Sequence, residues 1–177
     1  LLLVYMVINK KKMNVNVFLP CRAGSQRVPR KNLKQFGKYK NGLLEIKLNQ
    51  LLNSKLINKI FLSTNDLDII EYAKSLQNSK LIIHKRIEEL SSNNALTDDL
   101  INHAADLINE GELLWTHVTS PFINSELYDE IIQKYLEVKE LGYDSLMTTN
   151  LVHGYIWDKK GSVNYDRSIE KWPRTQT

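Results

Sequence analysis

The chain has 177 residues, of which 42% are hydrophobic and 25% are charged. These fractions are close to the averages for globular proteins, so they exclude a disordered, collagen-like or coiled-coil chain and favour one domain with a hydrophobic core. The single cysteine, Cys21, excludes an internal disulfide and a multi-thiolate metal site, so we expect a reducing, cytoplasmic location.

Positive charge is concentrated near the N-terminus. Residues 1–50 hold eleven Lys or Arg and one acid, Glu45, whereas the whole chain has 24 basic and 20 acidic residues. The rest of the chain is therefore net acidic. A localised basic region of this kind predicts a polyanionic partner, which could be a nucleotide, a nucleic acid or a membrane surface.

The first twelve residues place an apolar run before three lysines, which is the reverse of a secretory signal. The run is also too short to span a bilayer. Because Met13 directly precedes the first clear strand pattern, we expect translation to start there and residues 1–12 to be a tail or upstream read-through.

In chain order, the pattern predicts a strand at 14–20, a basic loop to about residue 42, a helix at 43–54, a strand at 58–63, a helix from 65 to about 77, a strand at 81–84, a helix from 97, a strand at 112–118, a long helix after the turn at 120–122, and a strand at 144–149. Strands that alternate with helices are typical of an α/β fold with a mainly parallel sheet. No internal repeat or linker interrupts residues 13–177, so we expect a single domain there, with its C-terminal part missing.

The predicted helix at Thr97 has a clear start. Thr97 is expected to cap it, and Asp98 and Asp99 are expected to lie in its positive first turn. Its buried face is predicted to consist of Ile101, Ala104, Ala105 and Ile108.

The loop after the first strand carries the strongest chemical signal. Residues 22–32 contain four cations, and the small Ala23-Gly24-Ser25 stretch lets backbone N–H groups approach a ligand. The loop contains neither a Walker sequence nor GxGxxG. It therefore fits a nucleotide triphosphate, although a solvated basic loop would look similar.

Five short strings occur in order between residues 13 and 176: RAGSQRVPRKN at 22–32, LSTND at 62–66, RIEELSS at 86–92, TSP at 119–121 and PRTQ at 173–176. Together they closely resemble the acylneuraminate cytidylyltransferases, which are the CMP-sialic acid synthetases and their relatives acting on legionaminic and pseudaminic acids. The resemblance implies a Rossmann-like, three-layer α/β/α nucleotidyltransferase fold. It also implies an enzyme that transfers CMP from CTP to a nine-carbon keto sugar acid and releases pyrophosphate, a reaction that activates sugar acids for cell-surface polysaccharides.

The resemblance also implies roles for individual residues. Arg22 and Lys31 would be catalytic and hold the phosphates, with Lys31 nearest the α-phosphate. Nucleotide contacts are implied for Ala23, Gly24, Ser25, Arg27, Asn32, Arg86 and Thr97, the last two at the cytosine. His117, Arg174 and Gln176 would contact the sugar acid. Without a ligand, Arg86 would be a surface residue and His117 a structural histidine.

Three departures from the family pattern bear on these roles. Gln26 stands where the family usually has lysine, and His117-Val118 stands where it often has Gln-Pro. The aspartates that hold Mg²⁺ in the family lie beyond PRTQ, so Mg²⁺ is an implied cofactor whose ligands we do not expect among residues 1–177. We therefore expect these residues alone to bind CTP weakly and to turn over negligibly.

Several alternatives stay open at this point. The protein could use an octulosonic acid, or it could be a catalytically incomplete module that binds a nucleotide or a protein partner. Nucleic acid is not expected, because only Phe36 and Tyr39 accompany the cations as aromatic residues. No membrane partner is expected, and a homodimer is compatible with the family.

Overall fold

The computed structural model describes residues 14–92, 94–151 and 154–171. The chain divides into two compact units, the first ending at Gly142 and the second beginning at Tyr143. The single domain predicted over residues 13–177 and the start at Met13 stay predictions.

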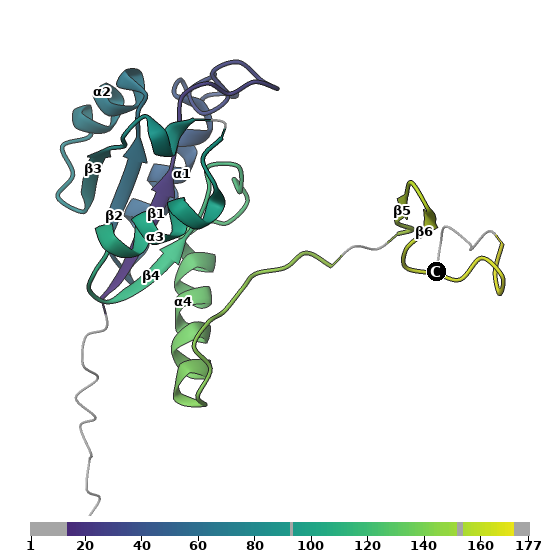
Figure 1. The fold of residues 1–177 in the computed structure, drawn as a ribbon. Coiled ribbons are helices and arrows are strands. Elements are labelled where there is room, and N and C mark those ends of the chain that lie inside the picture. Colours follow the sequence, from purple (N-terminus) through teal and green to yellow (C-terminus); the bar gives the residue numbers. More distant parts are fainter. Residues whose placement is uncertain (1–13, 93, 152–153, 172–177) are drawn as a thin grey trace, which may run out of the picture. The chain divides into compact units, whose positions relative to one another are not determined.

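A four-stranded parallel sheet forms the centre of the first unit (Figure 1). Its strands are β1 (Val15–Pro20), β2 (Ile57–Thr64), β3 (Leu81–Lys85) and β4 (Glu112–Trp115), in the order β3-β2-β1-β4. The parallel pairing confirms the predicted α/β class. It also places the carboxyl ends of all four strands at one edge of the sheet, where the loops that follow them meet.

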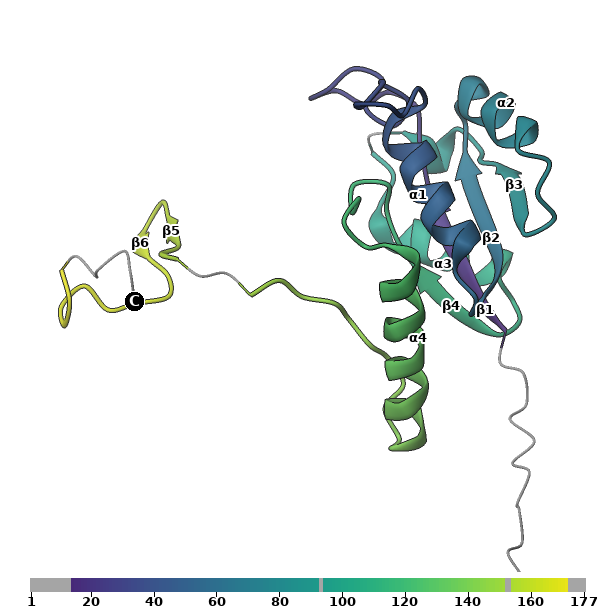
Figure 2. The same ribbon diagram turned by 180° about the vertical axis from the view of Figure 1, so that it is seen from behind.

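Four helices cover the sheet and make the layers on its two faces. They are α1 (Gly42–Asn53), α2 (Leu67–Ser75), α3 (Thr97–Leu107) and α4 (Ser125–Glu140). Figure 1 shows α3 in front of the sheet, and Figure 2 shows α1 and α4 in front of it from the other side. Among the helices of the described residues, none is both long enough and apolar enough to cross a bilayer.

The alternation of side chains along β1 separates two hydrophobic clusters. Val15, Val17 and Leu19 point to the face covered by α1, α2 and α4, where they join the larger cluster. Phe18 points to the opposite face and packs with Ala104 and Ile108 of the α3 segment. The sheet is therefore buried on both faces, as parallel sheets require.

The start and the buried face of α3 differ from the prediction. Leu96, with extended backbone, takes the cap position, and no side chain caps the helix, so the capping role predicted for Thr97 is wrong. Thr97 is the first helical residue, and the acids that follow it lie in the first turn as expected. Ala104 and Ile108 are buried as predicted, but Ile101 and Ala105 are exposed. The prediction is wrong at these two positions because Leu100, one position before Ile101, packs with Phe18 instead.

Two strand predictions are also corrected. β4 ends at Trp115 instead of residue 118, and no strand forms at 144–149, where every side chain is exposed. A strand needs a neighbour to satisfy its backbone groups, and within the described residues this segment has none. The second unit contains instead a short antiparallel hairpin, β5 (Trp157–Asp158) and β6 (Gly161–Ser162).

Gly111, just before β4, offers a test of the packing between β1 and β4. Its φ is +81°, and a Cβ there would lie 2.2 Å from the carbonyl oxygen of Asn14. We expect Gly111→Ala to lower the free energy of unfolding by about 2–5 kcal/mol, the combined cost of the left-handed backbone and the clash.

Gly142→Ala is the matched control, because Gly142 has a φ of +90° but open space around its Cβ position. It should lose only the backbone cost, about 1–2 kcal/mol. Urea denaturation measures both variants. Equal losses would show that contact with Asn14 does not constrain Gly111.

Candidate functional site

The loop after β1 is fastened to the loops after β2 and to α1. The amide of Cys21 donates to the Ser63 carbonyl at 2.9 Å, and the amide of Ala23 donates to Oδ1 of Asn65 at 2.9 Å. Asn32 is buried; its side-chain amide donates to the Arg22 carbonyl, and its own carbonyl accepts from the amide of Leu44. The basic segment is therefore a folded part of the sheet edge and not a freely solvated loop.

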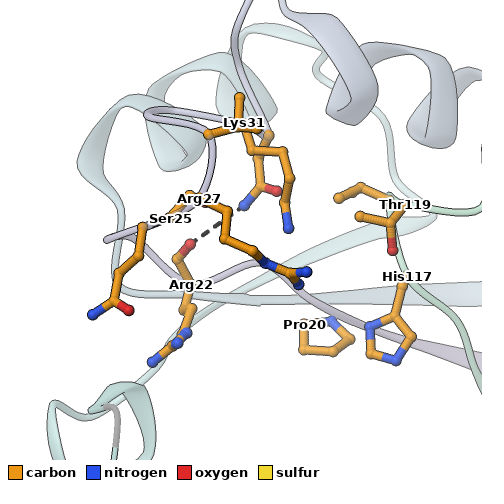
Figure 3. A pocket seen from close by; sticks show the side chains of 11 residues that line it. Pro20, Arg22, Ser25, Arg27, Lys31, His117 and Thr119 are labelled. Atoms are coloured by element: carbon orange, nitrogen blue, oxygen red, sulfur yellow. Dashed lines mark hydrogen bonds between the residues drawn. The ribbon is translucent and has the colours of Figure 1, made fainter. Parts of the chain in front are cut away.

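A cavity of about 270 Å³ lies between this loop and the loop after β4, and we call it the first pocket (Figure 3). Its lining residues are Pro20, Arg22, Ser25, Gln26, Arg27, Val28, Lys31, Asn32, His117, Val118 and Thr119. Three of them are cationic, and among these described residues none is acidic. In Figure 3 the side chain of Arg27 reaches across the cavity toward the side of His117 and Pro20.

A second pocket of about 190 Å³ lies along the same loop. Its lining residues are Arg22, Ala23, Gly24, Ser25, Pro29, Arg30, Asn32, Leu33 and Asp66. The structure brings to the two pockets all seven loop residues for which a catalytic or nucleotide-binding role was predicted, namely Arg22, Ala23, Gly24, Ser25, Arg27, Lys31 and Asn32. Ala23 and Gly24 line the second pocket only.

Two arginines hold the turn that follows β3, at residues 88–92. The Arg22 guanidinium donates to the carbonyls of Ser91 and Ser92 at 3.2 and 3.0 Å. Arg86 is 4% exposed, and its guanidinium donates to the hydroxyl and carbonyl oxygens of Ser63 and to the Leu90 carbonyl. The alternative that Arg86 is a surface residue is therefore wrong, because its donors fasten this turn to the end of β2.

The remaining predicted contacts are not gathered at the first pocket. Neither Arg86 nor Thr97 is among the lining residues of the two pockets, and Thr97 is exposed. Arg174 and Gln176 lie outside the described residues. Their assignments stay predictions.

His117 does lie at the first pocket, on the loop after β4. Its Nε2 accepts a hydrogen bond of 2.9 Å from the indole N–H of Trp115. Burial, followed by the charge of Lys31, lowers the pKa of His117 below its ordinary value, which favours the neutral ring.

A buried lysine fixes the loop that carries His117. Lys47 of α1 is fully buried, and its Nζ donates to the carbonyls of Ser120 and Ile123 and, at 2.8 Å, to the hydroxyl of Tyr128. The Tyr128 hydroxyl also lies 2.7 Å from Oγ1 of Thr116. Burial lowers the pKa of Lys47 to about 8. The sequence does not reveal the role of Lys47, because a lysine in a helix is ordinarily exposed.

The residues of the site do not by themselves provide a magnesium centre. Among the described residues, no group of three His, Cys, Asp or Glu side chains is placed to hold a metal ion. Asp66, the one carboxylate lining the second pocket, caps α2 by accepting from the amide of Asp68. The magnesium expected from the resemblance therefore stays a prediction.

Cys21 packs in the core. The side chain is 1% exposed, and burial raises the pKa of its thiol to about 12. The thiol is therefore protonated at neutral pH and is a poor nucleophile.

The first unit has the fold of the nucleotidyltransferase class, with a cationic loop at the carboxyl end of its first strand. It superposes with a TM-score of 0.54 on the structure of CMP:2-keto-3-deoxy-manno-octonic acid synthetase complexed with CTP, at 16% identity, covering 70% of this chain and 48% of that one. A cytidylyltransferase from Leptospira borgpetersenii serovar Hardjo-bovis (strain JB197) gives 0.51 at 22% identity, covering 71% and 50%.

The family model described as cytidylyltransferase matches residues 17–163, and the chain belongs to this family. A pseudaminic acid cytidylyltransferase from Campylobacter jejuni subsp. jejuni serotype O:2 (strain ATCC 700819 / NCTC 11168) is 28% identical over 125 residues. The alignment covers 67% of this chain and 52% of that protein, so the chain spans about half the length of the curated relatives that it matches.

Replacing Lys47 tests whether it supports the pocket loop. Lys47→Met keeps the apolar stem but leaves the Ser120 carbonyl and the Tyr128 hydroxyl without their donor. We expect a loss of about 1–3 kcal/mol in the free energy of unfolding, measured by urea denaturation. Lys59→Met is the control, since Lys59 donates to one exposed carbonyl, that of Ser79, and it should cost about 1 kcal/mol or less. Equal losses would contradict the supporting role of Lys47.

The pair His84 and His103, on β3 and α3, predicts a pH dependence of stability. Their rings are 4.9 Å apart, and Nε2 of His103 is buried with no hydrogen-bond partner among the described residues. Burial is the main cause that lowers the pKa of both histidines. Positive charge lowers it further: His103 and Arg86 act on His84, and Arg86 acts on His103.

The unfolded chain therefore binds more protons than the folded one below about pH 6.5, so the free energy of unfolding should fall as the pH decreases through that value. His103→Gln should show a smaller fall when unfolding is compared at about pH 7 and pH 5. A fall as large as that of the wild type would show that the pair does not titrate in this way.

Proposed function

We propose that this protein is a cytidylyltransferase that transfers CMP from CTP to a nine-carbon, sialic-like keto sugar acid and releases pyrophosphate. Membership of the cytidylyltransferase family supports the reaction type. The observation that carries the proposal is the first pocket, where three cations and no described acid line one cavity at the carboxyl ends of β1 and β4. Such a cavity is built to take a polyanion.

The proposed reaction forms one bond and breaks one. The anomeric hydroxyl oxygen of the sugar acid attacks the α-phosphorus of CTP, and its proton passes to water. The bond between the α-phosphorus and the oxygen that bridges to the β-phosphate breaks, and pyrophosphate leaves with the electron pair. Negative charge grows on the phosphate oxygens during this transfer, so fixed cations lower the barrier.

Lys31 and Arg27 are proposed to bind the phosphate oxygens directly. Both line the first pocket, and Arg27 replaces the charge that Gln26 does not supply. Ser25 and the amide of Asn32 would add hydrogen bonds, although that amide already donates to the Arg22 carbonyl. Arg22 can join them only by exchanging its bonds to the carbonyls of Ser91 and Ser92 for bonds to phosphate.

The base site is proposed to lie along residues 86–97. Because three donors of Arg86 are occupied by protein oxygens, its part is to hold the turn at residues 88–92 in place. Thr97 is proposed to contact the cytosine. Its hydroxyl does not cap α3, so this contact would not break a cap.

The acceptor is proposed to be of the nine-carbon class because the curated relatives from Campylobacter jejuni are pseudaminic acid cytidylyltransferases. His117, at the first pocket, is the described residue proposed to contact it. An octulosonic acid is the second candidate, supported by the fold shared with the octonic acid synthetase. We also propose a cytoplasmic protein, with a homodimer as a compatible assembly.

Substitution of Lys31 tests the nucleotide site. In Lys31→Gln we expect the Kd for CTP to rise about tenfold or more, because a charge-assisted hydrogen bond is worth about 1.5–3 kcal/mol. Lys40→Gln removes the same charge from the same basic segment but lies outside both pockets, so its Kd should change about twofold or less. Isothermal titration of CTP into the full chain measures both.

Thermal shifts with CTP, ATP and GTP complete the test, and CTP should give the largest stabilisation. Equal shifts for the three nucleotides, or equal losses in Lys31→Gln and Lys40→Gln, would contradict a specific cytidine site. CTP binding at the pocket without CMP transfer to any sugar acid would instead favour the nucleotide-binding module.

A further inference from the structure

Trp115 and His117 form a directed hydrogen bond at the end of β4. The indole N–H donates to Nε2 of His117 at 2.9 Å, and the ring centroids are 6.0 Å apart. An indole nitrogen can only donate, so the accepting Nε2 carries no proton. The neutral imidazole must then carry its single proton on Nδ1.

The sheet holds Trp115, and the hydrogen bonds of the following loop hold His117. Trp115 is the last residue of β4 and pairs with Phe18 of β1, and the two rings lie 4.9 Å apart. Phe18 is fully buried, which fixes one face of the indole. The carbonyl of His117 accepts from the amide of Ser120 at 3.2 Å, and Lys47 holds the Ser120 carbonyl. The donor and the acceptor are therefore presented to each other by rigid elements.

His117 lines the first pocket, and Figure 3 shows its ring beside Pro20, on the side of the cavity toward which the Arg27 side chain extends. If Nε2 were protonated, its N–H and the indole N–H of Trp115 would point at each other, and the hydrogen bond would be lost. Burial and the charge of Lys31 also disfavour the charged ring. His117 thus differs from the cations around it, because it offers an N–H group without a charge. Such a donor can bind an uncharged hydroxyl or carbonyl oxygen as well as an anionic one, whereas the charges of Arg27 and Lys31 suit the phosphates.

We propose that Trp115 is a positioning residue that fixes His117 as its Nδ1–H tautomer, so that the first pocket presents a neutral N–H donor to an acceptor oxygen of the bound sugar acid. The nature of that acceptor rests on the proposed function. The tautomer itself does not, because it follows from the hydrogen bond alone.

The tautomer is tested by nitrogen NMR on the full chain labelled with ¹⁵N-histidine at about pH 7.5. His117→Gln assigns the His117 resonances by their loss. In the wild type we expect a protonated Nδ1 and an unprotonated Nε2. Trp115→Phe keeps an aromatic ring against Phe18 but removes the N–H, and it should shift the population toward the Nε2–H form, while the His84 resonances stay in place and show that the fold is retained.

A protonated Nε2 in the wild type would overturn the proposal whether or not the variant folds. An unchanged tautomer in Trp115→Phe would also overturn it, because the ring would then be fixed by something else.

The ligand part is tested by titrating N-acetylneuraminate in the presence of CTP. Trp115→Phe and His117→Leu should weaken its binding at least fivefold, while His117→Asn, which keeps a donor near the Nδ1 position, should lose less. Lys40→Gln, which lies outside both pockets, is the control and should leave the Kd for the sugar acid within twofold. Sugar-acid binding that is unchanged in Trp115→Phe would overturn this part. A wild-type chain that shows the expected tautomer but binds no CTP would instead contradict the proposed function.

Discussion

The crowding of positive charge at the first pocket is the constraint on which the site depends. Arg22, Arg27 and Lys31 line a cavity of about 270 Å³, and among the described lining residues there is no carboxylate to balance them. Like charges at this spacing repel one another, and the repulsion is relieved when an anion enters. The carbonyl oxygens of Ser91 and Ser92 accept hydrogen bonds from the Arg22 guanidinium. Arg27 and Lys31 are left to bind a ligand.

The parallel sheet makes this arrangement possible because it brings the loops after all its strands to one edge. On one side of the pocket, Arg22 and Arg86 bind carbonyl oxygens of the turn after β3 and so join it to β1 and β2. On the other side, Lys47 reaches from α1 to the loop after β4. In each case the cation donates hydrogen bonds to protein oxygens. These bonds compensate for the loss of water around the charge, and they hold a loop in place. The loops around the binding surface are therefore held in place before a ligand arrives, which reduces the entropy lost on binding.

The regular elements could be predicted from the sequence where hydrophobic periodicity was strong. β1, β2, β3 and the first two helices lie within a few residues of their predicted positions. The prediction failed where the outcome depended on neighbours: Thr97 does not cap α3, and the alternation at 144–149 has no strand beside it among the described residues. The loop residues of the site were found because their pattern is local. Lys47 and the bond from Trp115 to His117 were not, because burial and side-chain direction follow from tertiary packing.

A crystal structure of the full chain with CTP tests the central claim most directly. The account predicts electron density for the triphosphate in the first pocket, with phosphate oxygens within hydrogen-bond distance of Nζ of Lys31 and of the Arg27 guanidinium. It would be contradicted by crystals in which CTP is bound at another surface while the pocket between the loops after β1 and β4 holds only solvent.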